Sequence, residues 1–316
     1  MIFRNTFKLL FTNFNLTYKV LIYKLIILLL SLGVAGTIAV PVITHLIDIN
    51  YFGFLTESVL KLFETINLGN VFITIKDVFL KTIEVINSLD SSLLINAILS
   101  ISVFVLIYGL IGDLCELSVI DCLNSNMSSK TRLSFFKSLV AKSFKSLGKT
   151  IINFVLSLPF YAIIVVILYF GFSYYDSVSQ IGKILIPMAM FLSLVLFSGL
   201  HLSIFAGFSP SIIINDEGLF KDLNTGFRTI RKKYFRVLST SIMTVFILYV
   251  CNLLIAVYSF FAGLIFTLPI SYLVIRLFKI IAYYESNGMR YYVGDGIRTP
   301  LKKEEQDKIN KMKYIV

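Results

Sequence analysis

The sequence predicts an all-α membrane protein with six transmembrane helices. Apolar residues make up 57 % of its 316 residues and charged residues only 15 %, whereas soluble proteins carry about 25 % charged residues. No Asp, Glu, Lys or Arg occurs in the 39 residues from Val237 to Ile275. As one straight helix they would be about 58 Å long, twice the ~30 Å apolar core of a bilayer. This segment is therefore expected to cross the membrane, turn and cross back.

Four other long apolar stretches carry no Asp, Glu, Lys or Arg, namely Leu25–Ile47, Ser91–Gly112, Thr150–Tyr175 and Ile184–Asn215. With the hairpin they predict spans near 23–45, 92–113, 151–173, 184–207, 237–257 and 261–283. The first stretch is too long for the apolar core of a cleavable signal, which is about 7–15 residues. It is expected to be a retained helix.

The distribution of charge predicts an orientation. Six spans would put segments 1–24, 113–149, 208–236 and 276–316 on one side, and these carry 25 of the 29 Lys and Arg residues. Because Lys and Arg are retained on the cytoplasmic side, both termini are expected to be cytoplasmic, in a bacterial cytoplasmic membrane. The Lys-, Ile- and Asn-rich composition is typical of an AT-rich bacterial genome.

The basic loops are expected to meet anionic lipid headgroups, at about 1 kcal/mol per cation near the surface. A nucleic acid or an acidic protein partner is the alternative, and we favour the lipid. The candidate headgroup contacts are Lys137, Lys142, Lys145, Arg228, Arg231, Lys232 and Lys233.

The one sizeable segment on the opposite side, 48–90, is not a polar linker. Its apolar residues recur mostly at spacings of three and four, which predicts two amphipathic helices with a break at Asn67-Leu68-Gly69-Asn70. These helices would lie in the interface, cap the bundle or extend the first two spans. A lid on the protein's own bundle is favoured over a surface for a partner.

A weak repeat predicts three units, each an elbow helix followed by a two-helix hairpin. The elbows are expected near 3–18, 131–148 and 219–236, where paired Phe residues alternate with Lys or Arg before a span begins. Such helices lie in the headgroup layer with their rings inward. The six spans are expected to form a single membrane domain over 1–287. The tail, 288–316, is expected to be cytoplasmic, exposed and partly helical.

Ionisable residues within spans are the first functional candidates in a membrane protein. Asp113 and Glu116, at the inner end of the second span, would share a helix face. They would either bind a cation or pair with Lys and Arg of the neighbouring elbows, and pairing is favoured. His201 lies within the fourth span, where a packing role is favoured over a proton or ligand role.

Motifs of known chemistry are missing from the sequence. There is no GxxxxGK[ST] phosphate loop, no HExxH, GxSxG or kinase set, and the three Cys residues have no metal-binding spacing. No catalytic, cofactor-binding or metal-binding residue is therefore assigned, and no cofactor is expected.

The stretch after the fourth span, FSPSIIINDE at 208–217, is followed by Gly226-Phe227 and by RKKYF at 231–235. This pattern resembles uncharacterised polytopic bacterial families related to the membrane domain that accompanies some glycerophosphoryl diester phosphodiesterases. The resemblance implies a membrane location and a six-helix layout with cytoplasmic elbows. It implies no reaction, since the phosphodiesterase catalytic domain is absent from this sequence.

The leading functional hypothesis is a non-catalytic protein that organises lipid or a membrane protein partner. The first alternative is a transport permease subunit that works with a separate ATPase. The second is an intramembrane enzyme acting on lipid, which would need Asp113, Glu116 and His201 to cluster.

Overall fold

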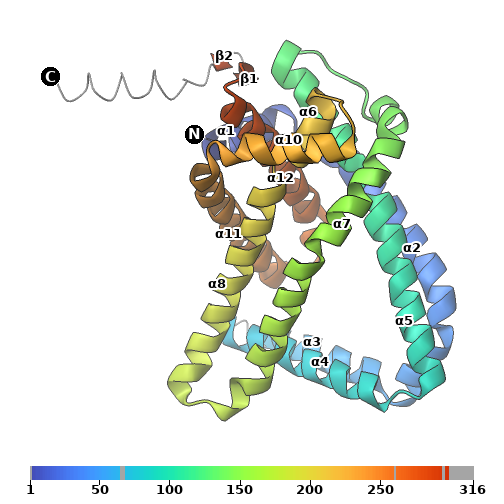
Figure 1. The fold of residues 1–316 in the computed structure, drawn as a ribbon. Helices are drawn as coiled ribbons and strands as arrows, with labels where there is room; N and C mark the ends of the chain where they lie inside the picture. The colour runs from blue at the N-terminus through green and yellow to red at the C-terminus, as the bar shows by residue number, and fades with distance from the viewer. Residues whose placement is uncertain (1, 65–67, 260, 294–295, 299–316) are drawn as a thin grey trace. The chain divides into compact units, whose positions relative to one another are not determined.

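A computed structural model describes residues 2–64, 68–259, 261–293 and 296–298 (Figure 1). Its helices are α1 (Ile2–Thr12), α2 (Asn15–Asp48), α3 (Tyr51–Glu64), α4 (Leu68–Ser88), α5 (Ser91–Leu106) with a π-helical turn (Ile107–Ile111), α6 (Cys115–Ser129), α7 (Phe135–Tyr174) with a 3-10 turn (Tyr175–Ser177), α8 (Gln180–Phe205), α9 (Phe208–Ile214), α10 (Leu219–Arg231), α11 (Tyr234–Tyr258) and α12 (Leu264–Asn287). Two short strands follow, β1 (Tyr291–Val293) and β2 (Gly296–Arg298).

The prediction of an all-α protein with six membrane-spanning helices is confirmed. Within the described residues, six helical stretches are long and apolar enough to cross a membrane, and each contains or overlaps one predicted span. The charge-free hairpin becomes α11 and α12, with turn residues at 259 and 261–263 between them. The chain is an integral membrane protein with several spans.

The segment between α2 and α5 forms two separate helices, as its periodicity predicts. Asn50, with a positive φ of 52°, separates α3 from α2, so α3 does not continue that helix. The Tyr51 hydroxyl lies 2.6 Å from the Thr82 hydroxyl and so ties α3 to α4. Of the predicted break at 67–70, Asn67 lies outside the described residues, and the other three positions already belong to α4, so the break does not extend to Asn70.

The three predicted elbows differ in structure. The first and third form helices of their own, α1 and α10, each followed by a short turn before the next long helix. The second starts at Phe135 and runs without interruption into the span, so that α7 is 40 residues long. The helix continues because no proline or turn sequence separates this segment from the span, and a single Gly148 is tolerated within a helix.

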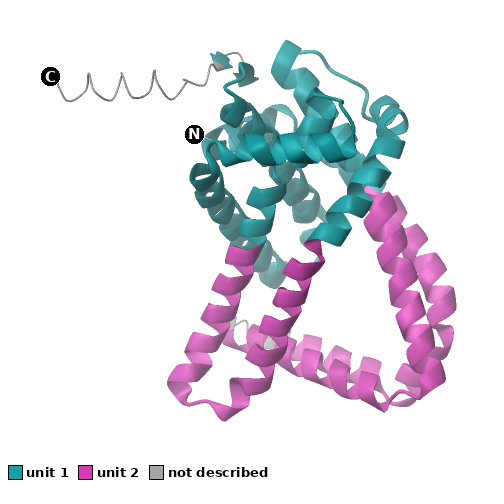
Figure 2. Ribbon diagram, viewed as in Figure 1, with its two compact units in different colours: residues 1–23, 113–156, 198–316 teal, residues 24–112, 157–197 magenta. Residues whose placement is uncertain are grey.

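By its internal contacts the chain divides into two compact units (Figure 2). Unit 1 contains Met1–Tyr23, Asp113–Leu156 and Ser198–Val316, and unit 2 contains Lys24–Gly112 and Ser157–Phe197. The single six-helix domain that the sequence predicts over 1–287 stays a prediction.

Unit 1 is built around α12, which is covered by α1, α6, α9, α10 and α11. Its buried core includes Leu117 of α6 with Phe208 and Ile212 of α9. α10 crosses close to α9 at two glycines: a Cβ on Gly226 would lie 2.7 Å from the carbonyl carbon and oxygen of Gly207. Only glycine allows the two backbones to approach this closely.

The chain after α12 returns to the core of unit 1. Strands β1 and β2 pair in an antiparallel hairpin, and Tyr291 of β1 is buried with its hydroxyl bonded to Glu285 at 2.8 Å. Asn5 of α1 donates to the same hydroxyl at 2.8 Å. This start of the predicted exposed tail is thus partly buried. The tail's predicted helical half, within 299–316, lies outside the described residues.

Unit 2 contains α3, α4, α5 and parts of α2, α7 and α8. Helix α4 packs on the turn between α7 and α8, where Phe72 contacts Phe172 and Tyr175 with ring centroids 5.4 and 5.0 Å apart. Lys76 of α4 donates to both carboxylate oxygens of Asp176 at 2.8 Å.

Candidate functional site

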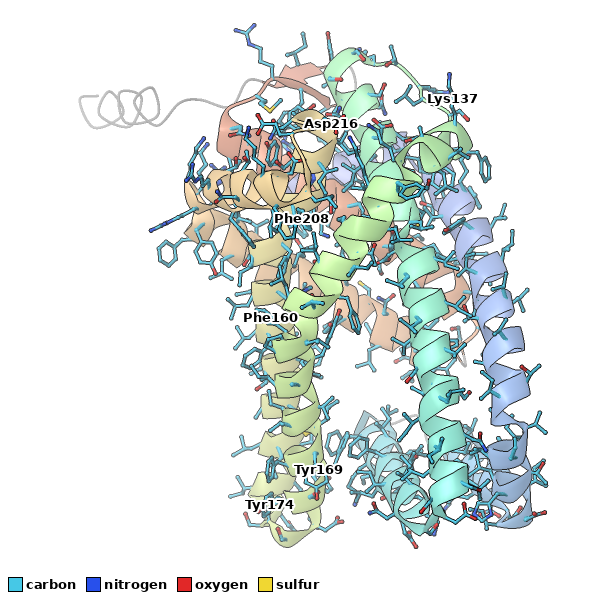
Figure 3. The ribbon with its side chains drawn as sticks, turned by 45° about the vertical axis from the view of Figure 1, so that its right-hand side comes forward. Lys137, Phe160, Tyr169, Tyr174, Phe208 and Asp216 are labelled. Atoms are coloured by element: carbon cyan, nitrogen blue, oxygen red, sulfur yellow. The ribbon has the colours of Figure 1, made fainter. Side chains whose placement is uncertain are left out.

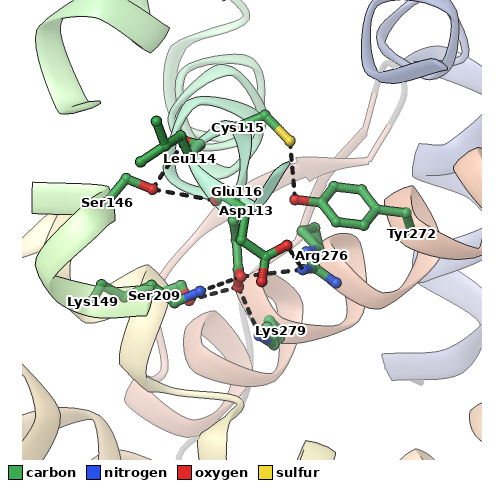
Figure 4. A network of polar contacts seen from close by, with 10 residues as sticks. All are labelled: Asp113, Leu114, Cys115, Glu116, Ser146, Lys149, Ser209, Tyr272, Arg276 and Lys279. Carbon is green, nitrogen blue, oxygen red and sulfur yellow. Dashed lines mark hydrogen bonds and ion pairs between the residues drawn. The ribbon is translucent and has the colours of Figure 1, made fainter. Parts of the chain in front are cut away.

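Glu116, in the first turn of α6, is the centre of a buried polar cluster in unit 1 (Figure 4). Only 1 % of the residue is exposed. Its Oε1 accepts hydrogen bonds from Lys279 Nζ and Ser209 Oγ, both at 2.7 Å. Its Oε2 accepts from Arg276 Nη2 at 3.1 Å and from Lys149 Nζ. Both carboxylate oxygens are therefore bonded on two sides.

Four helices supply this cluster. Glu116 comes from α6, Lys149 from α7 and Ser209 from α9. Arg276 and Lys279 are three residues apart on α12, so they share one face of that helix. Because the carboxylate attracts three cations from two other helices, it holds α6, α7 and α12 together at one point.

The charges around Glu116 must be present together. A buried carboxylate without partners is very unfavourable, and three buried cations without an anion are equally so. Lys149 and Lys279 are buried like Glu116, and Arg276 is 9 % exposed. The cluster is therefore stable as a whole and unstable when one of its charges is lost.

Asp113 lies at the edge of this cluster and makes a weaker contact. Its Oδ1 is 3.9 Å from Arg276 Nη2 and its side chain is 32 % exposed. The Arg276 guanidinium lies over the Tyr272 ring, 3.7 Å from its centroid. The Tyr272 hydroxyl is 3.2 Å from Cys115 Sγ. Arg276 Nε, which is buried, has no hydrogen-bond partner among the described residues.

His201 of α8 is near the cluster. Its ring packs against Phe205, with centroids 4.9 Å apart. It interacts electrostatically with Lys279, Glu116 and Lys149. The structure thus brings Asp113, Glu116 and His201 to one region of unit 1, but the nearest groups to Glu116 are cations and Ser209.

The seven predicted headgroup cations fall into two groups. Lys137, Arg228, Arg231 and Lys232 are exposed, although Lys232 also donates to Asn287 at 3.2 Å. Lys142, Lys145 and Lys233 are half-buried. Lys145 pairs with Asp216, and Lys233 donates to the Glu285 carbonyl oxygen at 2.8 Å. The hydrogen bond from Lys145 holds the pKa of Asp216 below its ordinary value.

Asp222 of α10 has a structural role that its sequence position did not suggest. It is buried, and its carboxylate accepts from the backbone N–H groups of Gly218 at 3.2 Å and Glu217 at 3.5 Å. Burial raises the pKa of Asp222, and these two hydrogen bonds counteract only part of that rise. The Asp222 carboxylate fixes the chain at the start of α10, where the positive end of the helix dipole favours an anion.

The arrangement around Glu116 suits structural pairing better than acid–base chemistry. A general base needs an oxygen within reach of the substrate proton, and both oxygens of Glu116 already accept from protein donors. In the part of the chain that the structure describes, no three His, Cys, Asp or Glu side chains gather as metal ligands would.

Sequence reasoning missed four residues of the cluster, Lys149, Ser209, Arg276 and Lys279. One signal was present: Arg276 and Lys279 are the first charges after the 39-residue apolar hairpin and are spaced three apart. Cations at that spacing on a span indicate a buried anion elsewhere in the bundle. Nothing in the sequence indicates that this anion is Glu116, 160 residues earlier.

Comparison with protein-family models, curated proteins and solved structures finds no match to this chain. The resemblance of 208–235 to families related to the phosphodiesterase membrane domain therefore stays a prediction.

Proposed function

We propose that this chain is a non-catalytic protein of the bacterial cytoplasmic membrane that organises anionic lipid, with both termini on the cytoplasmic side. The observation that carries the proposal is a segment of unit 1, residues 219–235, that contains both exposed cations and exposed aromatic rings. Arg228 and Arg231 of α10 are exposed, and Phe220 and Phe235 at either end of this segment are 77 % and 83 % exposed. Cations beside exposed rings suit the headgroup layer of an anionic membrane.

The engagement of Glu116 supports the non-catalytic part of the proposal. Of the three candidate polar residues, Glu116 is bonded to four donors and His201 packs against Phe205. The Asp113 side chain is 32 % exposed, but Arg276 lies beside it. An intramembrane enzyme built on these three residues would need at least one of them to exchange a proton with a substrate.

The orientation rests on the charge distribution. Of the 29 Lys and Arg residues, 25 would lie on the cytoplasmic side, including all the exposed cations of α10. The retention of cations on that side supports the assignment. Accessibility tags at each end of the chain test it directly: labelling of either tag from outside intact cells would contradict the proposed orientation.

The lipid proposal is tested by extracting the full-length protein from native membranes in polymer-bounded discs and measuring the co-purifying lipids. We expect anionic phospholipid to be enriched over the bulk membrane. The double variant Arg228→Gln/Arg231→Gln should lose much of this enrichment, because each cation near the surface contributes about 1 kcal/mol.

A matched control is Lys61→Gln/Lys183→Gln, which removes two exposed cations from unit 2. This variant should keep the enrichment. Equal lipid content in the wild type, the variant and the bulk membrane would overturn the lipid role, and turnover of a lipid by the purified protein alone would overturn the non-catalytic assignment.

A further inference from the structure

The first four turns of α7, residues 135–148, have one face that is attached to the rest of unit 1. Phe135, Ser138 and Ser146 on this face are buried. Ser138 donates to Asp121 at 2.6 Å, and Ser146 donates to the Leu114 carbonyl oxygen at 2.9 Å. Lys149, one residue further on, reaches Glu116. Spacings of three and eight place these residues on the same side of the helix.

The opposite face of the same four turns is apolar and exposed. Val140 is 78 % exposed and Phe144 93 %, and Phe136 and Leu147 lie in line with them at spacings of three and four. A phenylalanine ring exposed this far is unfavourable in water, since an exposed aromatic side chain forgoes most of its burial free energy. This stripe therefore requires an apolar environment that the described protein does not supply.

The flank of the stripe carries an exposed cation, Lys137, seven residues before Phe144 (Figure 3). Lys142, four residues from both Ser138 and Ser146, lies on the attached face and is half-buried. The sequence contains no Asp or Glu between Asp121 and Asp176. On the same helix, Lys145 pairs with Asp216 and Ser138 donates to Asp121. A positive flank beside an apolar stripe matches an anionic headgroup layer above acyl chains.

The stripe is also continuous with the lipid-facing side of the span. Ile151 and Val155, seven and eleven residues after Phe144, are exposed on the same face of the same uninterrupted helix. If residues 136–147 left the bilayer for water, their exposed side chains would be expected to become polar. They stay apolar like Ile151 and Val155, and this continuity favours lipid over a protein partner as the group that covers the stripe.

We propose that residues 135–148 of α7 form an interfacial anchor that binds anionic lipid, with Phe136, Val140 and Phe144 among the upper acyl chains and Lys137 at the phosphates. This inference rests on the proposed function and gives it a place in the chain. The anchor lies on α7. It is therefore separate from the exposed cations and rings of residues 219–235, whose helix α10 packs against α9 and α12.

The absence of tryptophan from the chain makes the test direct. Phe144→Trp introduces the only tryptophan, at the centre of the stripe, in the full-length protein reconstituted into nanodiscs. The discs contain equal amounts of phosphatidylglycerol and phosphatidylcholine. Bromine is carried by one lipid or the other, either near the headgroup or near the chain end. Val165→Trp, exposed in the later part of α7, is the reference.

We expect the Phe144→Trp fluorescence to be quenched more by bromine near the headgroup than by bromine near the chain end. Quenching should be stronger when phosphatidylglycerol carries the bromine. Removing the charge of Lys137 by substitution with Gln should reduce the preference for phosphatidylglycerol by roughly fivefold and leave the depth unchanged. Lys183→Gln, the charge-matched control, should change neither.

Fluorescence that no brominated lipid quenches would overturn the anchor, as would equal quenching by the two lipids. Protection of the fluorophore by a co-purified protein in place of lipid would also overturn it. The lipid enrichment of the whole protein is measured separately from this quenching. If anionic lipid is enriched but the tryptophan is not quenched, only the anchor is rejected. If there is neither enrichment nor quenching, the proposed function is rejected as well.

Discussion

The two units each contain a lysine that reaches a carboxylate far away in sequence, but the surroundings of the two pairs differ. In unit 1, Lys149 meets Glu116 inside the protein, where Arg276 and Lys279 bind the same carboxylate. In unit 2, Lys76 is buried but its partner Asp176 is 65 % exposed. The first carboxylate has lost water on all sides, whereas the second is still hydrated.

This difference indicates what each pair does for the fold. A buried charge that loses its partner has no water to replace it, so loss of one member of the Glu116 cluster should affect four helices. An exposed carboxylate that loses its partner returns to water at small cost. Interaction strength in this chain should therefore follow burial of the carboxylate more than the distance between the charged atoms, which is 2.7 Å for Lys279–Glu116 and 2.8 Å for Lys76–Asp176.

The largest effect is expected for Glu116→Gln. The side chain keeps its shape but leaves three buried cations without an anion, which should destabilise the protein by about 3–5 kcal/mol. Thermal unfolding in detergent, followed by helical circular dichroism, measures this. Glu84→Gln, which removes an exposed carboxylate paired with Lys81, is the control and should have little effect. Equal unfolding midpoints for the two variants would contradict the expected difference between the buried and the exposed carboxylate.

A neutral contact in unit 1 shows whether charge alone holds that unit together. Gly226→Ala would place a Cβ 2.7 Å from the Gly207 carbonyl group and force the two backbones apart. We expect a loss of about 1–3 kcal/mol in the same unfolding measurement. Gly33→Ala is the matched control, because a Cβ at Gly33 meets no atom within 4 Å. A Gly226→Ala protein as stable as the control would contradict the close approach.

A smaller effect is expected for Lys76→Met in unit 2, about 1 kcal/mol, because Asp176 can be hydrated. Burial lowers the pKa of Lys76, but the hydrogen bond to Asp176 and the charge of Asp77 outweigh it, so the pKa lies above its ordinary value of 10.5. The stabilisation by Lys76 is therefore complete below about pH 10.5 and is lost as the pH rises through the raised pKa.

This pH dependence gives a second test of the Lys76–Asp176 pair in unit 2. The difference in unfolding midpoint between wild type and Lys76→Met should be constant at neutral pH and shrink in strong alkali. Lys81→Met, at an exposed lysine of the same helix, is the control. A loss for Lys76→Met as large as that for Glu116→Gln would show that hydration of the carboxylate is not the deciding factor.

The smallest effect is expected for Asp216→Asn, which removes the exposed partner of Lys145. The loss should be below about 1 kcal/mol at pH 7. Because the pKa of Asp216 lies below its ordinary 3.8, its stabilisation is present above that value and is lost as the pH falls through the lowered pKa. The wild type and the variant should therefore have the same unfolding midpoint in strong acid, and a difference that grows with acidification would contradict this pairing.

Most of the fold could be predicted from the sequence because membrane spans leave a one-dimensional signal. The gap from Val237 to Ile275 contains no charged residue, and only a pair of helices could accommodate it. The two helices between the first two spans were also readable, since polar and apolar residues repeat at helical spacing, but the break at Asn50 was not predicted. The second elbow was predicted as a separate helix from its Phe and basic residues, although no proline or turn sequence separates it from the span.

The candidate site could be predicted only in part. Glu116 was recognised because an acid near the end of a span is unusual, but its partners come from helices that are distant in sequence. Which cations converge on it is decided by the packing of α12 against α6 and α9, and a single sequence contains no record of that packing. The burial of Tyr291 was missed for the same reason, since its contact with Asn5 joins residues 286 positions apart.

The distance in sequence between Glu116 and its partners has a consequence for biogenesis. A ribosome adding about 5–20 residues per second makes the 160 residues from Glu116 to Arg276 in roughly 8–32 s. During that interval the carboxylate has emerged while two of its three counterions do not yet exist. The nascent chain must therefore keep this acid in contact with water, lipid headgroups or an insertion factor until the last helix arrives, so integration of α6 is completed by a helix translated long after it.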